Sequence, residues 1–251
     1  MSTAHGLAGS LHRGASLARS CAGMNRDTGA PMASTRRDVR FLVLGASLGS
    51  RSLNNRLAGL AASIVEQKGG HADRAVIGDF EVPFYDPDIE KESGEPISAR
   101  RFCERLKAAD ALIVASPEYN ASMPGAIKNL IDWVSRFRPQ PFNGRQALLL
   151  SASPSMVGGN RGLWALRIPF EHLGTRVYPD MFSLAQAHEA MTADGQLQDA
   201  ALQDRLDRTL GCFLDLVEAT KHYPQIKKVW VEFLGERPNS ATDRIEESEA
   251  A

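Results

Sequence analysis

The sequence predicts an α/β fold: a three-layer, doubly wound sheet of five parallel strands. Short, wholly apolar runs such as residues 111–115 and 147–152 are typical of parallel strands buried on both faces. Each run is followed by a polar turn and then by apolar residues at helical spacing, and this alternation places helices on both faces of a sheet. Five strands of this length favour a flavodoxin-like strand order over a six-stranded dinucleotide-binding fold.

The individual elements follow from the spacing of apolar residues along the chain. Residues 39–44 form a short apolar run, after which Leu53, Leu57 and Leu60 recur at helical spacing. Residues 81–96 contain three prolines and predict a long irregular loop. The other strands are predicted at residues 75–80, 111–115, 147–152 and within 176–184, and the other helices at 97–110, 124–137, about 163–170 and 197–221.

Length and composition predict one folded domain with two extensions. The chain has 251 residues, of which 43% are hydrophobic and 24% are charged, enough to bury a sizeable core. We expect the domain to span residues 37–222. Residues 1–36 are rich in Ser, Ala, Gly and Arg with a single acid, Asp27, and are predicted to be a disordered N-terminal extension. Their composition also resembles that of a transit peptide or an over-long gene start. Residues 223–251 are predicted to be a C-terminal extension whose last part is disordered.

Charge and cysteine content argue against several classes of protein. The formal net charge of -1 gives no electrostatic footprint for nucleic acid. No apolar run approaches the roughly 20 residues that span a bilayer, so no membrane partner is expected. Cys21, Cys103 and Cys212 have neither metal-binding nor redox spacing, which predicts a cytoplasmic protein without a metal site.

Three turns are predicted at the carboxyl edge of the sheet, where open α/β sheets bind ligands. The first offers the hydroxyls of Ser47 and Ser52, the amide of Asn54, glycine-containing backbone and the amino end of a helix. These groups are typical of a phosphate cradle. The alternative is an ordinary helix N-cap formed by Ser50 or Ser52.

The second turn carries Pro117, Glu118, Tyr119 and Asn120. An aromatic wall beside extended backbone and a carboxamide suits a flat polar heterocycle. In the alternative interpretation, Tyr119 packs in an interface and Asn120 closes a turn.

The third turn runs from Ser153 to Arg161 and contains Gly158 and Gly159. Adjacent glycines let backbone approach a ring closely. Paired glycines are also common in loops without any ligand.

Taken together, the three turns resemble the NADPH-dependent FMN reductase family, which includes chromate, quinone and azo-dye reductases of flavodoxin-like fold. The resemblance covers roughly residues 40–217. The first turn departs from the family pattern, because Ala46 replaces a glycine, Gly49 replaces an arginine, and Arg51 lies two positions later. The strongest part of the signature is Pro117-Glu118-Tyr119-Asn120, followed by Ser122, Pro124-Gly125, Lys128-Asn129 and Asp132-Trp133.

The resemblance implies FMN and NADPH as cofactors and assigns residues to FMN. Arg51 has three alternatives: the FMN phosphate, the 2′-phosphate of NADPH, or solvent. The implied phosphate ligands are Ser47, Ser52 and Asn54, the implied ring contacts are Pro117, Glu118, Tyr119 and Asn120, and the implied third side is Ser153, Gly158 and Gly159.

The resemblance also implies an NAD(P)H-dependent flavin oxidoreductase. Hydride would pass from NADPH to FMN and then to a small acceptor such as a quinone, an azo compound, a metal oxyanion or free flavin. Because the flavin carries this chemistry, no catalytic side chain is expected. Arg51, Arg136 and Arg161 are candidates for the 2′-phosphate of NADPH.

Two other classes of function remain open at this point. The first is a flavodoxin-like electron carrier that a partner protein reduces, and the second is a flavin-free interaction module. Whichever function holds, we expect the helix at 124–137 to pack against a second copy in a homodimer or homotetramer. The reason is the apolar character of Tyr119, Met123 and Trp133.

Overall fold

The computed structural model describes residues 38–234, and its sheet confirms the predicted fold class. The strands are all parallel and run in the order β2-β1-β3-β4, with a fifth strand beside β4. That fifth strand is in two pieces, which pair with the start and the end of β4. The bounds are β1 (Arg40–Gly45), β2 (His71–Val76), β3 (Ala111–Ala115), β4 (Gln146–Ala152), β5 (Arg176–Val177) and β6 (Phe182–Leu184).

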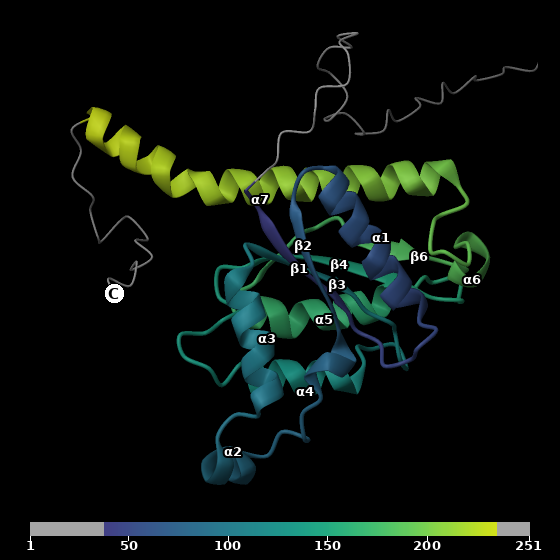
Figure 1. Cartoon of the computed structure of the whole chain (residues 1–251), viewed down its shortest axis with the longest axis horizontal. Coiled ribbons are helices and arrows are strands. Elements are labelled where there is room, and N and C mark those ends of the chain that lie inside the picture. Colours follow the sequence, from purple (N-terminus) through teal and green to yellow (C-terminus); the bar gives the residue numbers. More distant parts are fainter. Residues whose placement is uncertain (1–37, 235–251) are drawn as a thin grey trace, which may run out of the picture. The chain divides into compact units, whose positions relative to one another are not determined.

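Helices cover both faces of this sheet, as Figure 1 shows. Successive residues of β1 alternate between the two cores, because side chains of a strand point alternately to opposite faces. Phe41 and Val43 pack with the helices of one face, and Leu42 and Leu44 with those of the other. The first face carries α1 (Leu53–Gln67) and α7 (Ala200–Leu234), and the second carries α3 (Ile97–Ala108), α4 (Gly125–Val134) and α5 (Asn160–His172).

The predicted position of the second strand is wrong. The strand occupies His71–Val76, and a 3-10 helix, η1 (Ile77–Phe80), takes the place of its predicted second half. As an edge strand, β2 exposes Asp73 and Arg74, so it lacks the continuous apolar run that marks the inner strands. The Asp79 carboxylate accepts a hydrogen bond from the Val76 amide at 3.1 Å and turns the chain there.

The stretch 81–96 is not wholly irregular, because it contains α2 (Pro87–Ser93). Asp86 caps this helix by accepting a hydrogen bond from the Asp88 amide at 2.8 Å, and Pro87 occupies its first turn. None of its residues is buried. Polar contacts of Glu90 with Arg136, which follows α4, and with Tyr85 therefore hold α2 in place.

The last helix is longer than predicted. It begins at Ala200, where Asp199 caps the first turn, and it continues to Leu234 instead of ending near Lys221. A short helix, α6 (Ala187–Ala190), precedes it. The predicted disorder of residues 1–36 and of the last part of the chain lies outside the described residues, and the domain bounds 37–222 stay a prediction.

Candidate functional site at the carboxyl edge of the sheet

The three predicted turns do lie side by side at the carboxyl edge of the sheet. Backbone hydrogen bonds continue from the strands into the first residues of the turns and hold each turn to the end of the neighbouring strand. These bonds run from the Ala46 amide to the Ala115 carbonyl at 2.8 Å, from Ser116 to Leu150 at 2.9 Å, and from Ser153 to Leu184 at 3.0 Å.

The first loop is built around the cap of α1. The Ser52 hydroxyl accepts a hydrogen bond from the Asn55 amide at 3.2 Å, so the N-cap alternative is confirmed for Ser52. Within the described part of the chain, the amides of Leu48, Ser50 and Arg51 have no hydrogen-bond partner, and the Arg51 guanidinium has none either. Unpartnered amides at a helix amino end are the donors that a phosphate takes.

Asn54 ties the first loop to the third. It is buried, and its carboxamide bonds both backbone atoms of Ala152: its nitrogen donates to the carbonyl at 2.8 Å, and its oxygen accepts from the amide at 2.9 Å. The carboxamide is thus engaged at the end of β4. We refer to this pair of bonds as the Asn54 clamp.

The middle loop folds into a tight turn. The Tyr119 and Ser122 backbones exchange two hydrogen bonds of 3.0 Å, and Asn120 and Ala121 between them have φ angles of 52° and 60°. Positive φ at both central residues is typical of a type I′ turn. Asn120 therefore does close a turn, and the Tyr119 side chain is left 54% exposed. Ala121 is strained, because L-residues other than Asn and Asp rarely adopt this region.

Glu118 ties the middle loop to the start of α5. Its side chain is only 8% exposed, pairs with the Arg161 guanidinium, with Nε at 2.8 Å, and accepts the Gly162 amide at 3.2 Å. Burial raises the pKa of the Glu118 carboxyl, but the Arg161 side chain and the amides of Gly162 and Arg161 outweigh it, so the pKa lies below the usual value. The amino end of α5 adds a favourable dipole.

The third loop is packed down by its glycines. Gly158 and Gly159 have φ angles of 66° and 82° and are buried. A Cβ at Gly158 would meet the Ala185 amide at 3.0 Å, and one at Gly159 would meet the Ser151 hydroxyl at 2.0 Å. Close packing of protein against protein thus explains both glycines. The Ser153 hydroxyl accepts the Ser155 amide at 3.2 Å.

The sequence reasoning missed two residues that shape these loops. A Cβ at Gly162 would lie 3.0 Å from the Glu118 backbone, so a glycine lets α5 approach the middle loop. A glycine inside a helical pattern was the available signal. The second is Asn55, whose amide nitrogen donates to the Ser47 carbonyl at 3.0 Å and so shapes the first loop.

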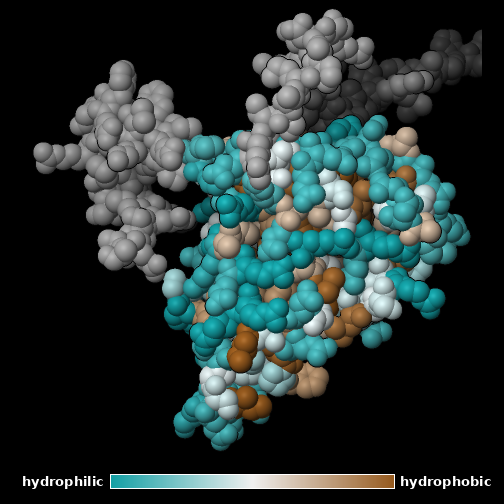
Figure 2. Space-filling view, in the orientation of Figure 1, coloured by the Kyte–Doolittle hydropathy of each residue, from teal (hydrophilic) through white to brown (hydrophobic). Residues whose placement is uncertain are grey.

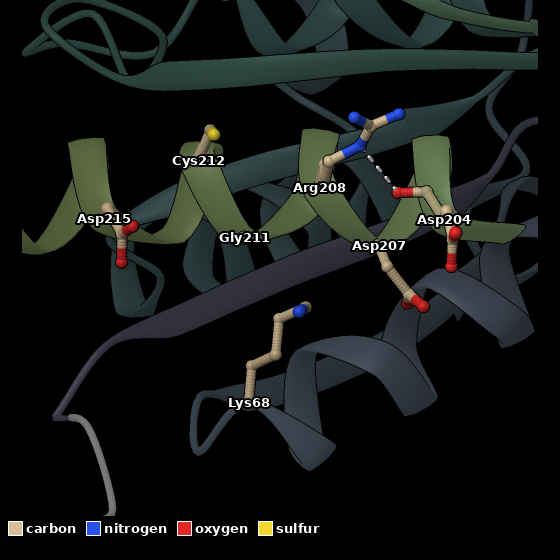
Figure 3. A pocket seen from close by; sticks show the side chains of 7 residues that line it. All are labelled: Lys68, Asp204, Asp207, Arg208, Gly211, Cys212 and Asp215. Atoms are coloured by element: carbon tan, nitrogen blue, oxygen red, sulfur yellow. Dashed lines mark hydrogen bonds between the residues drawn. The ribbon is translucent and has the colours of Figure 1, made fainter. Parts of the chain in front are cut away.

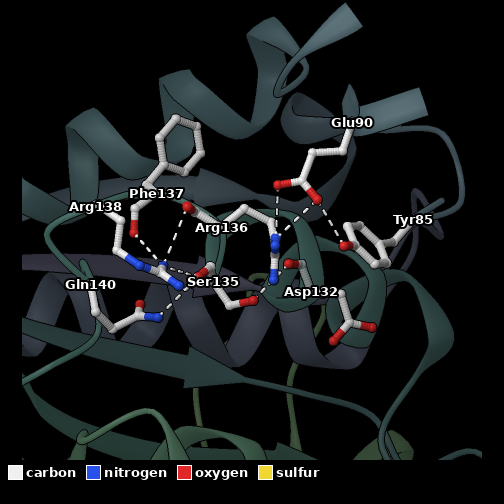
Figure 4. A network of polar contacts seen from close by, with 8 residues as sticks. All are labelled: Tyr85, Glu90, Asp132, Ser135, Arg136, Phe137, Arg138 and Gln140. Atoms are coloured by element: carbon white, nitrogen blue, oxygen red, sulfur yellow. Dashed lines mark hydrogen bonds and ion pairs between the residues drawn. The ribbon is translucent and has the colours of Figure 1, made fainter. Parts of the chain in front are cut away.

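The candidate arginines separate into different environments. Arg136 follows α4, whose 10 residues put it roughly 15 Å from the carboxyl edge. There its Nε donates to Glu90 at 2.8 Å, beside the Tyr85 hydroxyl (Figure 4). Arg136 is therefore not part of the site. Arg161 lies at the edge, paired with Glu118, and Arg51 lies there unpaired.

A shallow pocket of about 420 Å³ lies elsewhere, between the end of α1 and α7 (Figure 3). Its lining mixes Lys68 with three aspartates, Asp204, Asp207 and Asp215. It holds none of the predicted site residues. No group of three or more His, Cys, Asp or Glu side chains within residues 38–234 is placed to hold a metal ion.

Comparison with known proteins gives a consistent result. The model of the NADPH-dependent FMN reductase family matches residues 39–189. An NAD(P)H-dependent FMN reductase of Pseudomonas aeruginosa is 35% identical over 175 residues, which are 69% of this chain and 92% of that protein. A quinone reductase of Escherichia coli is 31% identical over 143 residues, 56% of this chain and 76% of that protein.

A solved structure agrees with these relatives. The flavoenzyme NAD(P)H:(acceptor) oxidoreductase of Paracoccus denitrificans superposes with a TM-score of 0.60 at 28% identity, over 72% of this chain and 97% of that one. The sheet and its helices define a flavodoxin-like α/β protein, and its three loops lie at the carboxyl edge, where open α/β sheets bind ligands.

The chain belongs to the NADPH-dependent FMN reductase family. It is an oxidoreductase with FMN and NAD(P)H as cofactors. Family membership favours the reductase over the electron carrier and the flavin-free module.

Proposed function

We propose that this oxidoreductase reduces a small acceptor, with quinones as the first candidates and azo compounds, metal oxyanions and free flavin as others. The acceptor class is supported by the relatives named quinone reductase. Bound FMN would supply the redox chemistry, taking hydride from NADPH and passing electrons to the acceptor. The observation that carries the proposal is the set of unpartnered donors on the first loop, next to two loops that the chain itself clamps in place.

The first loop would hold the FMN phosphate. The amides of Leu48, Ser50 and Arg51 are available as donors, Ser47 and Ser52 add hydroxyls, and the Arg51 guanidinium adds a charge. Charge-assisted bonds of this kind are the stronger ones that phosphates accept. Asn54 would support this cradle by fixing the start of α1, because its carboxamide is engaged by Ala152.

The other two loops would hold the isoalloxazine ring. The exposed Tyr119 ring and the backbone of Pro117 to Asn120 would line one side. Glu118 would hold the middle loop in place and would not bond the ring itself, because its carboxylate is already bonded to Arg161 and Gly162. Ser153, Gly158 and Gly159 would form the third side through their backbone, which the two buried glycines hold against Ala185 and Ser151.

The spectrum of purified protein tests this assignment. Flavin-loaded protein should be yellow and should bleach within seconds on adding NADPH without oxygen, and benzoquinone should then restore the colour. A yellow protein that only a separate reductase protein can bleach would select the electron carrier. A colourless protein whose spectrum does not change with added FMN would select the flavin-free module.

We also propose a cytoplasmic homodimer or homotetramer. Large apolar side chains are exposed on the domain, including Phe84, Ile97, Trp164 and Ile168. Figure 2 shows hydrophobic surface in the lower part of the view, near α2. Trp133 cannot contribute to such a contact, because it is fully buried and donates its Nε1 to the Pro83 carbonyl. No helix within residues 38–234 is long and apolar enough to cross a membrane.

A further inference from the structure

Two large apolar residues occupy the tip of the third loop. The Ser155 carbonyl accepts a hydrogen bond from the Gly158 amide at 3.2 Å, so residues 155–158 form a β-turn with Met156 and Val157 at its two central positions. Met156 is 75% exposed and Val157 is 45% exposed. The central positions of turns usually hold Gly, Pro, Asn, Asp or Ser. Neither turn geometry nor packing in the two cores explains why these side chains are apolar.

The base of this turn is fixed to the body of the domain. The Ser155 carbonyl also accepts a hydrogen bond from the Gln186 amide at 3.2 Å. Gly158 is buried, and a Cβ there would meet the backbone of residues 183–185. Because these contacts occupy the base, the turn offers its exposed tip in a fixed position, which lowers the conformational entropy that a ligand would have to remove.

The tip lies close to another exposed apolar group of the candidate site, the Tyr119 ring. A Cβ built at Gly159 would lie 3.7 Å from the Glu118 Cβ, so the third and middle loops approach each other closely at these two residues. Val157 is two residues from Gly159, and Tyr119 follows Glu118 directly. Successive Cα atoms are about 3.8 Å apart, so neither residue is more than roughly 8 Å from this approach. The two turns thus bring apolar side chains to one place at the carboxyl edge.

The charges at this place are already compensated. The Glu118 carboxylate pairs with Arg161 and accepts the Gly162 amide, and the side chains of Met156 and Val157 have no N–H or O–H group to donate. An oxyanion such as chromate would lose hydration at the tip without gaining hydrogen bonds there, which is unfavourable. A planar apolar molecule would gain by covering the tip, because a thioether makes favourable contacts with ring edges.

We propose that Met156 and Val157 determine acceptor specificity, by contacting the apolar part of a quinone that carries a fused ring or alkyl substituents. The inference rests on the proposed reductase function, which places the acceptor beside the middle and third loops. It narrows the acceptors from any oxidant of a reduced flavin to quinones with a large apolar surface, and it sets these apart from metal oxyanions.

Binding of 2-methyl-1,4-naphthoquinone to the oxidised, flavin-loaded protein tests this inference without turnover. The double variant Met156→Gln, Val157→Thr nearly keeps both side-chain shapes but makes them polar. It should raise the dissociation constant roughly tenfold, measured by the change in flavin absorbance, because the ring no longer covers apolar surface. In turnover, it should raise the KM of the same quinone with little change in kcat. The kcat/KM for chromate should stay the same, because an oxyanion gains nothing from the apolar tip.

The matched control is Leu216→Gln on α7. Leu216 is 38% exposed and lies five residues before Lys221, whose Nζ is 3.3 Å from the Asp110 carboxylate at the amino end of β3. The same change from apolar to polar is thereby made far from the carboxyl edge. It should leave the affinity and the KM for the quinone unchanged.

Three results would overturn the assignment of the tip. The first is an equal quinone affinity for the parent and the double variant, and the second is an equal loss of affinity for Leu216→Gln. The third is a lower mass of the double variant in light scattering, which would assign the tip to a contact between copies. If the double variant loses quinone affinity but NADPH does not bleach the parent, the reductase activity alone is contradicted, so the two failures are distinguishable.

Discussion

At the scale of single residues, the site depends on positions where a side chain is absent as much as on those where one is present. Gly159 combines a φ of 82° with the Ser151 hydroxyl 2.0 Å from where its Cβ would be. Either feature alone disfavours any other residue, because the Ser151 hydroxyl could rotate away but the Ser151 Cβ, 3.0 Å from the same point, is fixed to β4.

We expect Gly159→Ala to destabilise the protein by about 2–4 kcal/mol, because the overlap adds to the cost of a left-handed alanine. The control is Gly125→Ala, where a Cβ meets nothing within 4 Å and the residue starts α4, so stability should hold or rise slightly. Urea unfolding measures both. Equal midpoints for the two variants would contradict the packing argument.

Arg51 is the residue whose role the sequence left open, and its lack of a partner within residues 38–234 makes it available to a ligand. If it holds the FMN phosphate, Arg51→Ala should raise the FMN dissociation constant roughly 10- to 100-fold, the size of a lost charge-assisted bond. The KM for NADPH should change little. Titration of the apoprotein with FMN, alongside Arg101→Ala on the exposed side of α3, separates this effect from a general loss of charge. A raised KM for NADPH with unchanged FMN affinity would assign Arg51 to the 2′-phosphate instead.

At the scale of elements, the ion pair of Glu118 joins the middle loop to α5, and its effect depends on pH. The pKa of Glu118 is lower in the folded protein than its usual value of 4.5. The stabilisation is therefore fully present above about pH 4.5 and is lost as the pH falls below that value through the folded-state pKa.

Glu118→Gln should lower the free energy of unfolding by about 1–2 kcal/mol at pH 7, because it removes the charge from bonds to Arg161 and Gly162. The difference between variant and parent should shrink as the pH approaches 3. Thermal melts at pH 7, 5 and 3 measure this trend. A difference that stays constant across the range would show that the carboxylate charge contributes nothing.

The elements also show what sequence reasoning can and cannot reach. The inner strands β3 and β4 were predicted within a residue, since burial on both faces leaves an uninterrupted apolar run. The edge strand β2 was displaced, because one side of it meets water and its polar residues interrupt the run. The helix α2 was missed although Asp86 and Pro87 gave a start signal, because it buries nothing.

The candidate site likewise has a part that the sequence could predict and a part that it could not. The three loops could be placed from topology alone, since parallel strands end at one edge. The partners of Glu118 and Asn54 could not, because Gly162 and Ala152 are 44 and 98 residues away in sequence. Contacts of that separation depend on the packed fold and leave no local pattern.

At the scale of the whole molecule, cofactor binding should stabilise the entire domain, since FMN would contact loops from β1, β3 and β4 together. At a free FMN concentration 100 times the dissociation constant, binding to the folded state alone adds about 2.7 kcal/mol. For a domain of this size, that corresponds to a rise in Tm of roughly 5–10 °C. Melts of the apoprotein with and without FMN check this. Riboflavin, which lacks the phosphate, should give a much smaller rise in Tm. An equal rise would contradict the assignment of the first loop to the FMN phosphate.

The Asn54 clamp has a consequence for how quickly and how tightly a ligand is captured. The clamp fastens the first loop to β4, and Glu118 fastens the middle loop to α5. Folding itself has therefore already fixed both loops. Little conformational entropy then remains to be lost on encounter, which favours tight binding without an induced closure step. If the cofactor binds at these loops, the apoprotein is already preorganised for it, and the loops should show similar hydrogen-exchange protection before and after the cofactor arrives.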